Sequence, residues 1–446
     1  MSQKEDLTGP NREISQIKYP KNIQSIRTVL QGQFTKKIQA KRGSPVIVSG
    51  HQVGVFHPGI LAKEVLAGKL AKEQNGIAIT LVLDHDPTHV YFNYPDWNLK
   101  MDHHRLVKKD CHLGDIFLKK KGLARIHSER WQSHLIELSK NCEHYLNRET
   151  TENARQSIET LLDNRNKYDN LIDYLVFSRM QDLQKEKIEI FPVRTSDLIA
   201  TPEWKNFAND IYENGSRFRE IYNRALSMYR TEHGIINHAQ PVPDLHEEEL
   251  PFWIYTNPEL ESREKAYKNN FDAQKALPRA ITLSLFVRLY LSDIFIHGTG
   301  GARYDVVTNQ IMHEYFNVSI SPYMVETRTL QIPLLKDSTL NEIKMLPTLS
   351  NWTTEYRRFQ FHPERSLNKN HPYRQKRAEL IKEFKVQKGA KKKIHDELEK
   401  NRKTILNDLK HENETRLATR SKILEYEKDR EALYNRTFPY FFYDWR

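Results

Sequence analysis

The stretch SPVIVSGHQVGVFHPGILAKEVLAGKLAKEQNGIAITLVLDHDPTHV, residues 44–90, decides the fold of this chain. Residues 46–48 are apolar and β-branched, which is typical of a buried parallel strand. Apolar residues then recur at helical spacing over residues 60–72, and Asn75-Gly76 is a helix stop signal. A second apolar run covers residues 77–83. The stretch therefore predicts two parallel strands joined by a helix, the repeating unit of an α/β sheet.

Polar side chains follow both predicted strands. Gly50-His51-Gln52 comes after the first strand, and Asp84-His85-Asp86 comes after the second. Because the carboxyl ends of parallel strands meet at one edge of a sheet, we expect both groups to face the same crevice, where open α/β sheets bind ligands. The first group is either a tight turn that needs glycine or a substrate-binding turn, in which the His51 ring and the Gln52 amide offer hydrogen bonds.

The group Asp84-His85-Asp86 has the residue types of a catalytic site. Such residues supply a general base, hold an imidazole in one tautomer or ligate a metal. The alternative is a cluster that caps the turn before Pro87. A metal site would need a further ligand, either His89 or one of Asp102, His103 and His104, and no zinc-binding motif supports one. We predict Asp84, His85 and Asp86 as catalytic residues, and we predict no metal site.

A glycine-rich loop follows the second apolar block of the chain. The block, residues 280–296, fits either a buried helix or a helix followed by a strand. Dense glycine exposes backbone amides, and a helix is expected over residues 306–316, so the loop lies at a helix N-terminus that favours an anion. The alternative is a plain loop with a surface pair of Arg303 and Asp305. The predicted binding residues of the loop are His297, Gly298, Gly300, Gly301, Arg303, Tyr304 and Asp305.

Composition limits the class of protein. The chain has 446 residues and a formal net charge of +11, which suggests an anionic partner such as nucleic acid, a nucleotide or a carboxylated small molecule. No apolar run reaches the length of a transmembrane helix, and the first residues lack the apolar core of a signal peptide. Two cysteines are too few for a disulfide framework. We therefore expect a cytoplasmic protein that does not bind membranes.

The pattern along the chain predicts an α/β protein with a Rossmann-like parallel sheet, helical insertions and a C-terminal coiled coil. Residues 1–122 form the first part of the core, 123–184 a helical insertion, 185–370 the second part with connecting segments, and 371–446 the coiled coil and an aromatic tail. The coil is predicted from Ile394, Leu398, Ile405 and Leu409, which have the spacing of an a/d seam. The tail, residues 437–445, is too aromatic to lie free in water, so we expect it to pack on the core.

The order of these motifs resembles that of the bacillithiol biosynthesis cysteine-adding enzymes. The resemblance rests on Gly50-His-Gln-Val-Gly54, Pro58-Gly59, Asp84-His85-Asp86 and Gly298-Thr-Gly-Gly-Ala-Arg-Tyr304, followed by the helical arm and the aromatic end. It spans about residues 40–445. The chain departs from the family pattern at His51, Leu83, Thr299 and Gly301, where the family usually has Gln, Glu, Pro and Glu. The sequence is thus similar to a divergent member.

The resemblance implies an activity and a set of site residues. The family joins cysteine to an amino-sugar malate through an amide bond, which implies a carboxylate–amine ligase that binds an amino-sugar acid and cysteine, with a nucleotide such as ATP or ADP as a possible cofactor. The family's coiled coil supports a homodimer. By carry-over, Gly50, Gln52, Gly54 and Gly59 frame the pocket, the Asp84 group forms its floor, and Gly298, Gly300 and Tyr304 close its far side.

Two other classes of function stay open at the sequence level. Asp84-x-Asp86 with Asp102-His103-His104 loosely resembles the metal-dependent DHH phosphoesterases, although no matching upstream motif is present. The two carboxylates missing from the family pattern favour a non-catalytic scaffold that binds a protein or RNA. Interleaved basic and aromatic residues at 356–362 fit RNA stacking, but they are more often ordinary surface.

Overall fold

The computed structural model describes residues 27, 29–33, 43–86, 88–98, 105–116, 129–144, 146–168, 170–257, 262–319, 321–333, 345–386, 389–433 and 437–445. The chain divides into two compact units. The first unit contains Met1–Asp96, Lys108–Pro333 and Arg436–Arg446, and the second contains Trp97–Val107 and Leu334–Asn435. Residues 334–370, which were expected within the α/β core, belong to the second unit.

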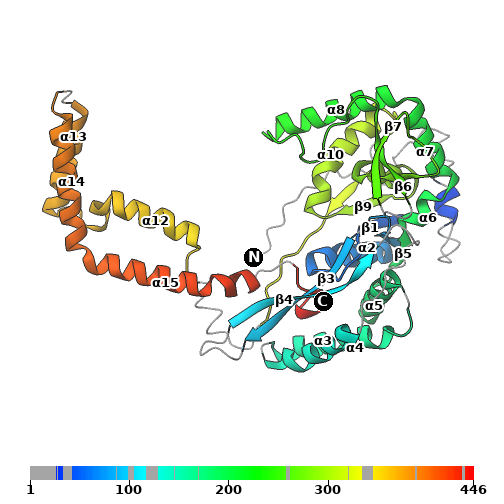
Figure 1. Cartoon of the computed structure of the whole chain (residues 1–446), viewed down its shortest axis with the longest axis horizontal. Coiled ribbons are helices and arrows are strands. Elements are labelled where there is room, and N and C mark those ends of the chain that lie inside the picture. The colour runs from blue at the N-terminus through cyan, green and yellow to red at the C-terminus, as the bar shows by residue number, and fades with distance from the viewer. Residues whose placement is uncertain are drawn as a thin grey trace. The chain divides into compact units, whose positions relative to one another are not determined.

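A five-stranded parallel sheet forms the centre of the first unit (Figure 1). Its strands are β1 (Val46–Gln52), β2 (Ile77–Leu83), β5 (Phe191–Arg194), β9 (Ile294–His297) and β10 (Tyr323–Val325). Their order is β10-β9-β1-β2-β5, and all neighbours pair in parallel. Helix α2 (Pro58–Glu73) connects β1 to β2 as the sequence predicts. The mixed α/β fold with a Rossmann-like parallel sheet is thereby confirmed.

Helices cover both faces of this sheet, which explains why its central strands are apolar on both sides. On one face, Thr80 of β2 donates a hydrogen bond to Glu64 of α2 over 2.7 Å. On the other face, β1 and β2 contribute to an aromatic core with Trp204 of α7 (Pro202–Glu213) and Phe286 of α9 (Ala280–Tyr290). The predicted N-cap of α7 is confirmed, because the Thr201 hydroxyl accepts from the Trp204 amide.

The strand order creates a switch point between β1 and β9. From β1 the chain proceeds outward through β2 to β5, and it then returns to place β9 on the opposite side of β1. Helix α10 (Thr299–Glu314) follows β9 directly. Since ligands of open α/β sheets bind outside the carboxyl ends of strands at such a reversal, this edge is the expected place for a site.

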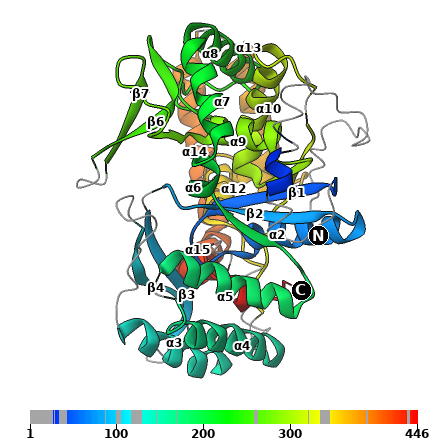
Figure 2. The same ribbon diagram turned by 90° about the vertical axis from the view of Figure 1, so that its right-hand side faces the viewer.

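Smaller elements surround the sheet, as Figure 2 shows. The helices expected within residues 123–184 are present as α3 (Glu129–Asn141), α4 (Arg148–Asn164) and α5 (Leu171–Lys185). Strands β3 (Thr88–Asn98) and β4 (Arg105–Ile116) form a two-stranded sheet. A three-stranded antiparallel sheet consists of β6 (Glu249–Asn257), β7 (Ser262–Tyr267) and β8 (Ala276–Pro278). A one-turn helix, α6 (Thr195–Ile199), follows β5.

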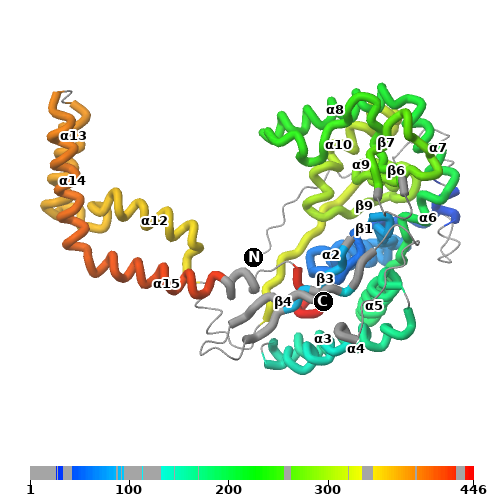
Figure 3. Tube along the Cα trace, viewed as in Figure 1, coloured from blue at the N-terminus to red at the C-terminus, as the bar shows by residue number. Residues whose placement is uncertain are grey.

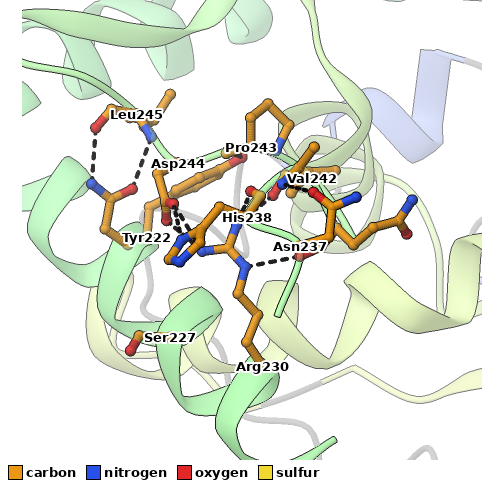
Figure 4. A network of polar contacts seen from close by, with 12 residues as sticks. Tyr222, Ser227, Arg230, Asn237, His238, Val242, Pro243, Asp244 and Leu245 are labelled. Atoms are coloured by element: carbon orange, nitrogen blue, oxygen red, sulfur yellow. Dashed lines mark hydrogen bonds and ion pairs between the residues drawn. The ribbon is translucent and has the colours of Figure 1, made fainter. Parts of the chain in front are cut away.

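A buried arginine fixes the proline-rich segment before β6 (Figure 4). Arg230 of α8 (Gly215–Glu232) donates to both carboxylate oxygens of Asp244 over 2.8 Å. It also donates to the backbone carbonyls of His238, Gln240 and Val242. One guanidinium thus donates to the backbone carbonyls of a turn that has few backbone hydrogen bonds of its own. This turn leads the chain into β6.

The aromatic tail returns to the first unit, as expected. Figure 3 shows it in red beside the start of α2, where the Tyr440 amide donates to the Phe56 carbonyl over 2.8 Å. Its one-turn 3-10 helix η5 spans Tyr440–Phe442. Phe438, Phe442 and Tyr443 are completely buried. The tail is therefore part of the hydrophobic core.

The second unit consists mainly of helices, which are α12 (Leu349–Phe361), α13 (Pro372–Val386), α14 (Lys391–Asp408) and α15 (Lys410–Leu433). Helices α13 and α14 pack side by side, and α12 packs on α15 (Figure 1). Ile394 and Ile405 of the predicted seam are buried here together with Leu380. The C-terminal helices are thereby confirmed. Within the described residues, no helix is both long and apolar enough to cross a membrane.

Candidate functional site

A cavity of about 400 Å³ opens at the carboxyl ends of β1, β2 and β9. It brings together three groups of residues that the sequence predicts as a site, although they lie far apart along the chain. The predicted residues that line it are Gly50, His51, Gln52, His85, Asp86, His297, Gly298, Gly300, Gly301 and Tyr304. The expectation that the first two strand ends face one crevice is correct.

Five of the predicted residues are placed elsewhere. Asp84 and Asp305 are buried behind the cavity walls, and the Arg303 side chain is exposed on α10. Gly54 lies at a smaller hollow beside Tyr440, and the Gly59 amide donates to the His57 ring at the start of α2. Their predicted roles in binding or catalysis receive no support from this arrangement.

Asp84 supports the helix that follows β5. Its carboxylate accepts hydrogen bonds from the Ser196 amide and from the Thr195 hydroxyl, both over 2.9 Å, and from the Ser196 hydroxyl. A carboxylate at a helix N-terminus satisfies donors that have no partner within the helix. Asp84 therefore supports the start of α6, whereas the alternative in the sequence analysis was a cap of the turn before Pro87.

His85 points into the cavity, and Thr195 holds its ring. The Thr195 hydroxyl lies 2.7 Å from His85 Nδ1 and within hydrogen-bond distance of two acceptors, the Asp84 carboxylate and the Val82 carbonyl. The ring also makes a hydrogen bond with the backbone of Pro278, and Thr195 and Pro278 together fix its orientation. Burial lowers the pKa of His85, although Asp86 and Asp84 oppose the shift. The ring is thus a neutral proton acceptor at pH 7.

Asp86 is held as an anion by two partners from distant parts of the chain. Gln52 donates to Oδ2 over 2.9 Å, and Arg263 of β7 forms an ion pair with Oδ1. Burial by itself raises the pKa of Asp86, but the hydrogen bonds from Gln52 and Arg263 outweigh it and lower the pKa. Asp86 is consequently a weak base and a fixed negative charge.

Two arginines contact the ring of Trp253, a residue of β6 that lines the cavity. The guanidinium carbons of Arg279 and Arg263 lie 4.4 Å and 4.9 Å from the centre of its ring, which is cation–π geometry. Arg279 also donates to Glu249 over 2.9 Å, whereas its buried Nε has no hydrogen-bond partner among the described residues. Arg279 therefore lines the cavity and has a buried donor that the described residues do not satisfy.

Lys63 is a buried lysine at the cavity. Its side chain comes from α2 and is 5% exposed, and its ammonium group donates to the Gly50 carbonyl over 2.7 Å. No carboxylate of the described residues pairs with it, because the adjacent Glu64 is bound by Arg179 and Thr80. Burial lowers the pKa of Lys63 to about 8.

His51 and His297 are both held in one orientation. His51 Nδ1 lies 3.1 Å from the Gln52 carbonyl, and burial, followed by the charge of Lys63, lowers the pKa of His51 to about 4. His297 Nε2 lies 2.6 Å from Asp305, whose fully buried carboxylate also pairs with Arg288 over 2.8 Å. Although burial opposes it, the charges of Arg288 and His297 keep the pKa of Asp305 far below its usual value.

Gly301 has to be a glycine for His297 to lie where it does. A Cβ atom at this position would be 2.5 Å from His297 Nδ1 and 3.3 Å from the Tyr304 hydroxyl. Any side chain at this position would therefore collide with the His297 ring unless the ring moved.

The sequence analysis did not assign several lining residues to the site, and those with charged or aromatic side chains include Lys63, Trp253, Arg263 and Arg279. A signal existed for Lys63, because a lysine within the apolar run of a core helix is an exception to the pattern. Arg263 is 177 positions from its partner Asp86, and nothing in the local sequence indicates their contact. The three cations outnumber Asp86, the carboxylate among the described lining residues, so the cavity favours an anionic ligand.

The described residues contain no group of three His, Cys, Asp or Glu side chains arranged to hold a metal ion. His89, one suggested ligand, is exposed on β3. Asp102, His103 and His104 lie outside the described residues. In comparisons with known proteins, no family model matches the chain, and no curated protein matches it.

Proposed function

We propose that this chain is a carboxylate–amine ligase and a divergent relative of the bacillithiol biosynthesis cysteine-adding enzymes. The observation that carries the proposal is the cavity, where the neutral proton acceptor His85 lies beside the cations Lys63, Arg263 and Arg279. A ligase of this type needs one group to deprotonate the amine and others to hold the negative charge of the acid.

Each of the cavity residues has a separate role in the proposed amide formation. An amine enters as an ammonium ion that the fixed charge of Asp86 attracts. His85 accepts a proton from it, and the freed lone pair attacks the activated carboxyl carbon. The activating group then leaves with the electron pair of its bond to that carbon as the amide forms. Arg279 at the cavity wall holds the oxygens of the acid, and Thr195 holds the His85 ring in place.

The first test is turnover of cysteine and an amino-sugar malate by a His85→Gln variant. Loss of the proton acceptor should lower kcat by about 10²- to 10⁴-fold, while the melting temperature stays close to that of the wild type. The matched control is His89→Gln, an exposed histidine four positions away. If His85→Gln retains the wild-type kcat, or if the wild type forms no amide from these substrates, the proposed assignment is wrong.

We also propose that two copies of the chain associate through the helices of the second unit, as a coiled coil. The predicted seam residues Ile394 and Ile405 are already buried within the unit, so a second copy would need another apolar face. Leu417 and Leu424 of α15 supply one, because they are seven positions apart and are 41% and 45% exposed.

A further inference from the structure

Two elements meet at one corner of the cavity, and neither has a charge partner there. Lys63 approaches from α2, and the first turn of α10 approaches from the end of β9. A Cβ atom placed on Gly298 would lie 4.0 Å from Lys63 Cδ, so the lysine stem passes directly beside the helix start. Both elements line the same cavity.

The start of α10 is open to a ligand. Its N-cap, Gly298, makes no side-chain capping hydrogen bond, and its first turn contains no acidic residue. A Cβ atom on Gly300 would meet no other atom within 4 Å, which places open space at this turn. Over its 16 residues the helix adds a partial positive charge at this end.

The buried ammonium group is the independent observation that points to a ligand. An ammonium group has three donors, and one of them is satisfied by the Gly50 carbonyl. A buried charge without a counter-ion is costly, and an anion bound at this corner would remove that cost. The lysine is 5% exposed, so bulk water does not replace such an anion.

We propose that this corner binds a phosphoryl group, held by Lys63 and by the first-turn amides of α10. The inference rests on the proposed function and deepens it, because it assigns a phosphate-bearing ligand to the same cavity. A lysine is a point charge that suits phosphate, and convergent helix amides match the several oxygens of that group. Arg263 and Arg279 also line the cavity, but Arg263 forms an ion pair with Asp86 and Arg279 forms one with Glu249.

The test is isothermal titration of the full chain, in buffer free of phosphate and sulfate, with inorganic phosphate, ADP, glucose 6-phosphate and malate. Lys63→Met should weaken every phosphate-bearing probe at least tenfold. Gly300→Asp should also weaken these probes at least tenfold. An aspartate in the first turn stabilises a helix, so this loss of binding would not come from a weakened α10. The matched control, Lys69→Met on the exposed side of α2, should bind as the wild type does.

The probes distinguish the sources of the phosphoryl group. Tighter binding of ADP than of inorganic phosphate, lost in Lys63→Met, supports a nucleotide, and tighter binding of the sugar phosphate supports a phosphorylated substrate. If the wild type binds no phosphate-bearing probe, or if Lys63→Met binds them unchanged, the inference is overturned. Amide formation is measured separately. Turnover without phosphate binding would overturn this inference alone, and phosphate binding without turnover would overturn the ligase alone.

Discussion

Lys63 and Glu64 are consecutive residues of α2, and both are buried, yet their charges are satisfied in different ways. Glu64 accepts from Arg179 over 2.9 Å and 3.2 Å and from Thr80 over 2.7 Å. A buried charge with such partners is compensated within the fold. The Lys63 ammonium group donates to one acceptor, the backbone carbonyl of Gly50. Its charge is therefore the one that remains available to a ligand.

His51 predicts how stability depends on pH. Its pKa is about 4 in the folded protein and 6.5 in an unfolded chain, so between these limits the unfolded chain binds more protons than the folded one. The free energy of unfolding should therefore fall as the pH is lowered from 6.5 to 4. Between pH 6.5 and pH 4, the free energy of unfolding of a His51→Gln variant should fall by about 1–2 kcal/mol less than that of the wild type. This figure allows for the partial exposure of the His51 side chain. Urea unfolding at each pH measures the difference, and parallel curves would contradict it.

The side chains of Asp84, His85 and Asp86 show what could not be predicted from the sequence. The residue types of Asp84-His85-Asp86 predicted a site at the end of β2, but they did not predict the direction of each side chain. After β2 ends, Asp84 accepts from the Ser196 amide of α6, whereas His85 and Asp86 line the cavity. The partners that decide these directions, Thr195 and Arg263, are more than a hundred positions away.

Among the elements, the C-terminal tail allows a direct test of its contribution to stability. The Tyr440 hydroxyl donates to the buried carboxylate of Asp182 over 2.6 Å. Tyr440→Phe should lower the free energy of unfolding by about 1–3 kcal/mol, because one carboxylate oxygen loses its partner. The control is Tyr168→Phe, a half-buried ring stacked on Phe177. Denaturant unfolding measures both variants, and equal losses would show that the hydroxyl contact is unimportant.

The apolar block over residues 280–296 shows what periodicity leaves undecided. Both a single helix and a helix followed by a strand were consistent with it, and the chain forms α9 and then β9. The break falls at Ser292 and Asp293. The Asp293 carboxylate accepts from the Val46 amide at the start of β1 over 2.8 Å. Asp293 thus lies at the boundary between α9 and β9, and its hydrogen-bond partner Val46 belongs to β1.

At the scale of the whole chain, the position of the cavity follows from topology. Residues 44–90 predicted the β1–α2–β2 unit, and the general rule for open sheets predicted a site at its carboxyl edge. The sequence did not predict that β9 would pair with β1 while β5 pairs with β2. That choice depends on packing across both faces of the sheet, and it is what brings the glycine-rich loop to His85.

Association of two chains is the remaining prediction at this scale. In sedimentation velocity the wild type should be a dimer, and the double variant Leu417→Glu with Leu424→Glu should be a monomer with the same helix content. Two carboxylates on an apolar helix face would have to be desolvated in the interface. Thr415→Glu with Lys422→Glu is the matched control, since both positions are exposed on α15 and also seven apart. A monomeric wild type, or a double variant that remains dimeric, would show that this face does not join two copies.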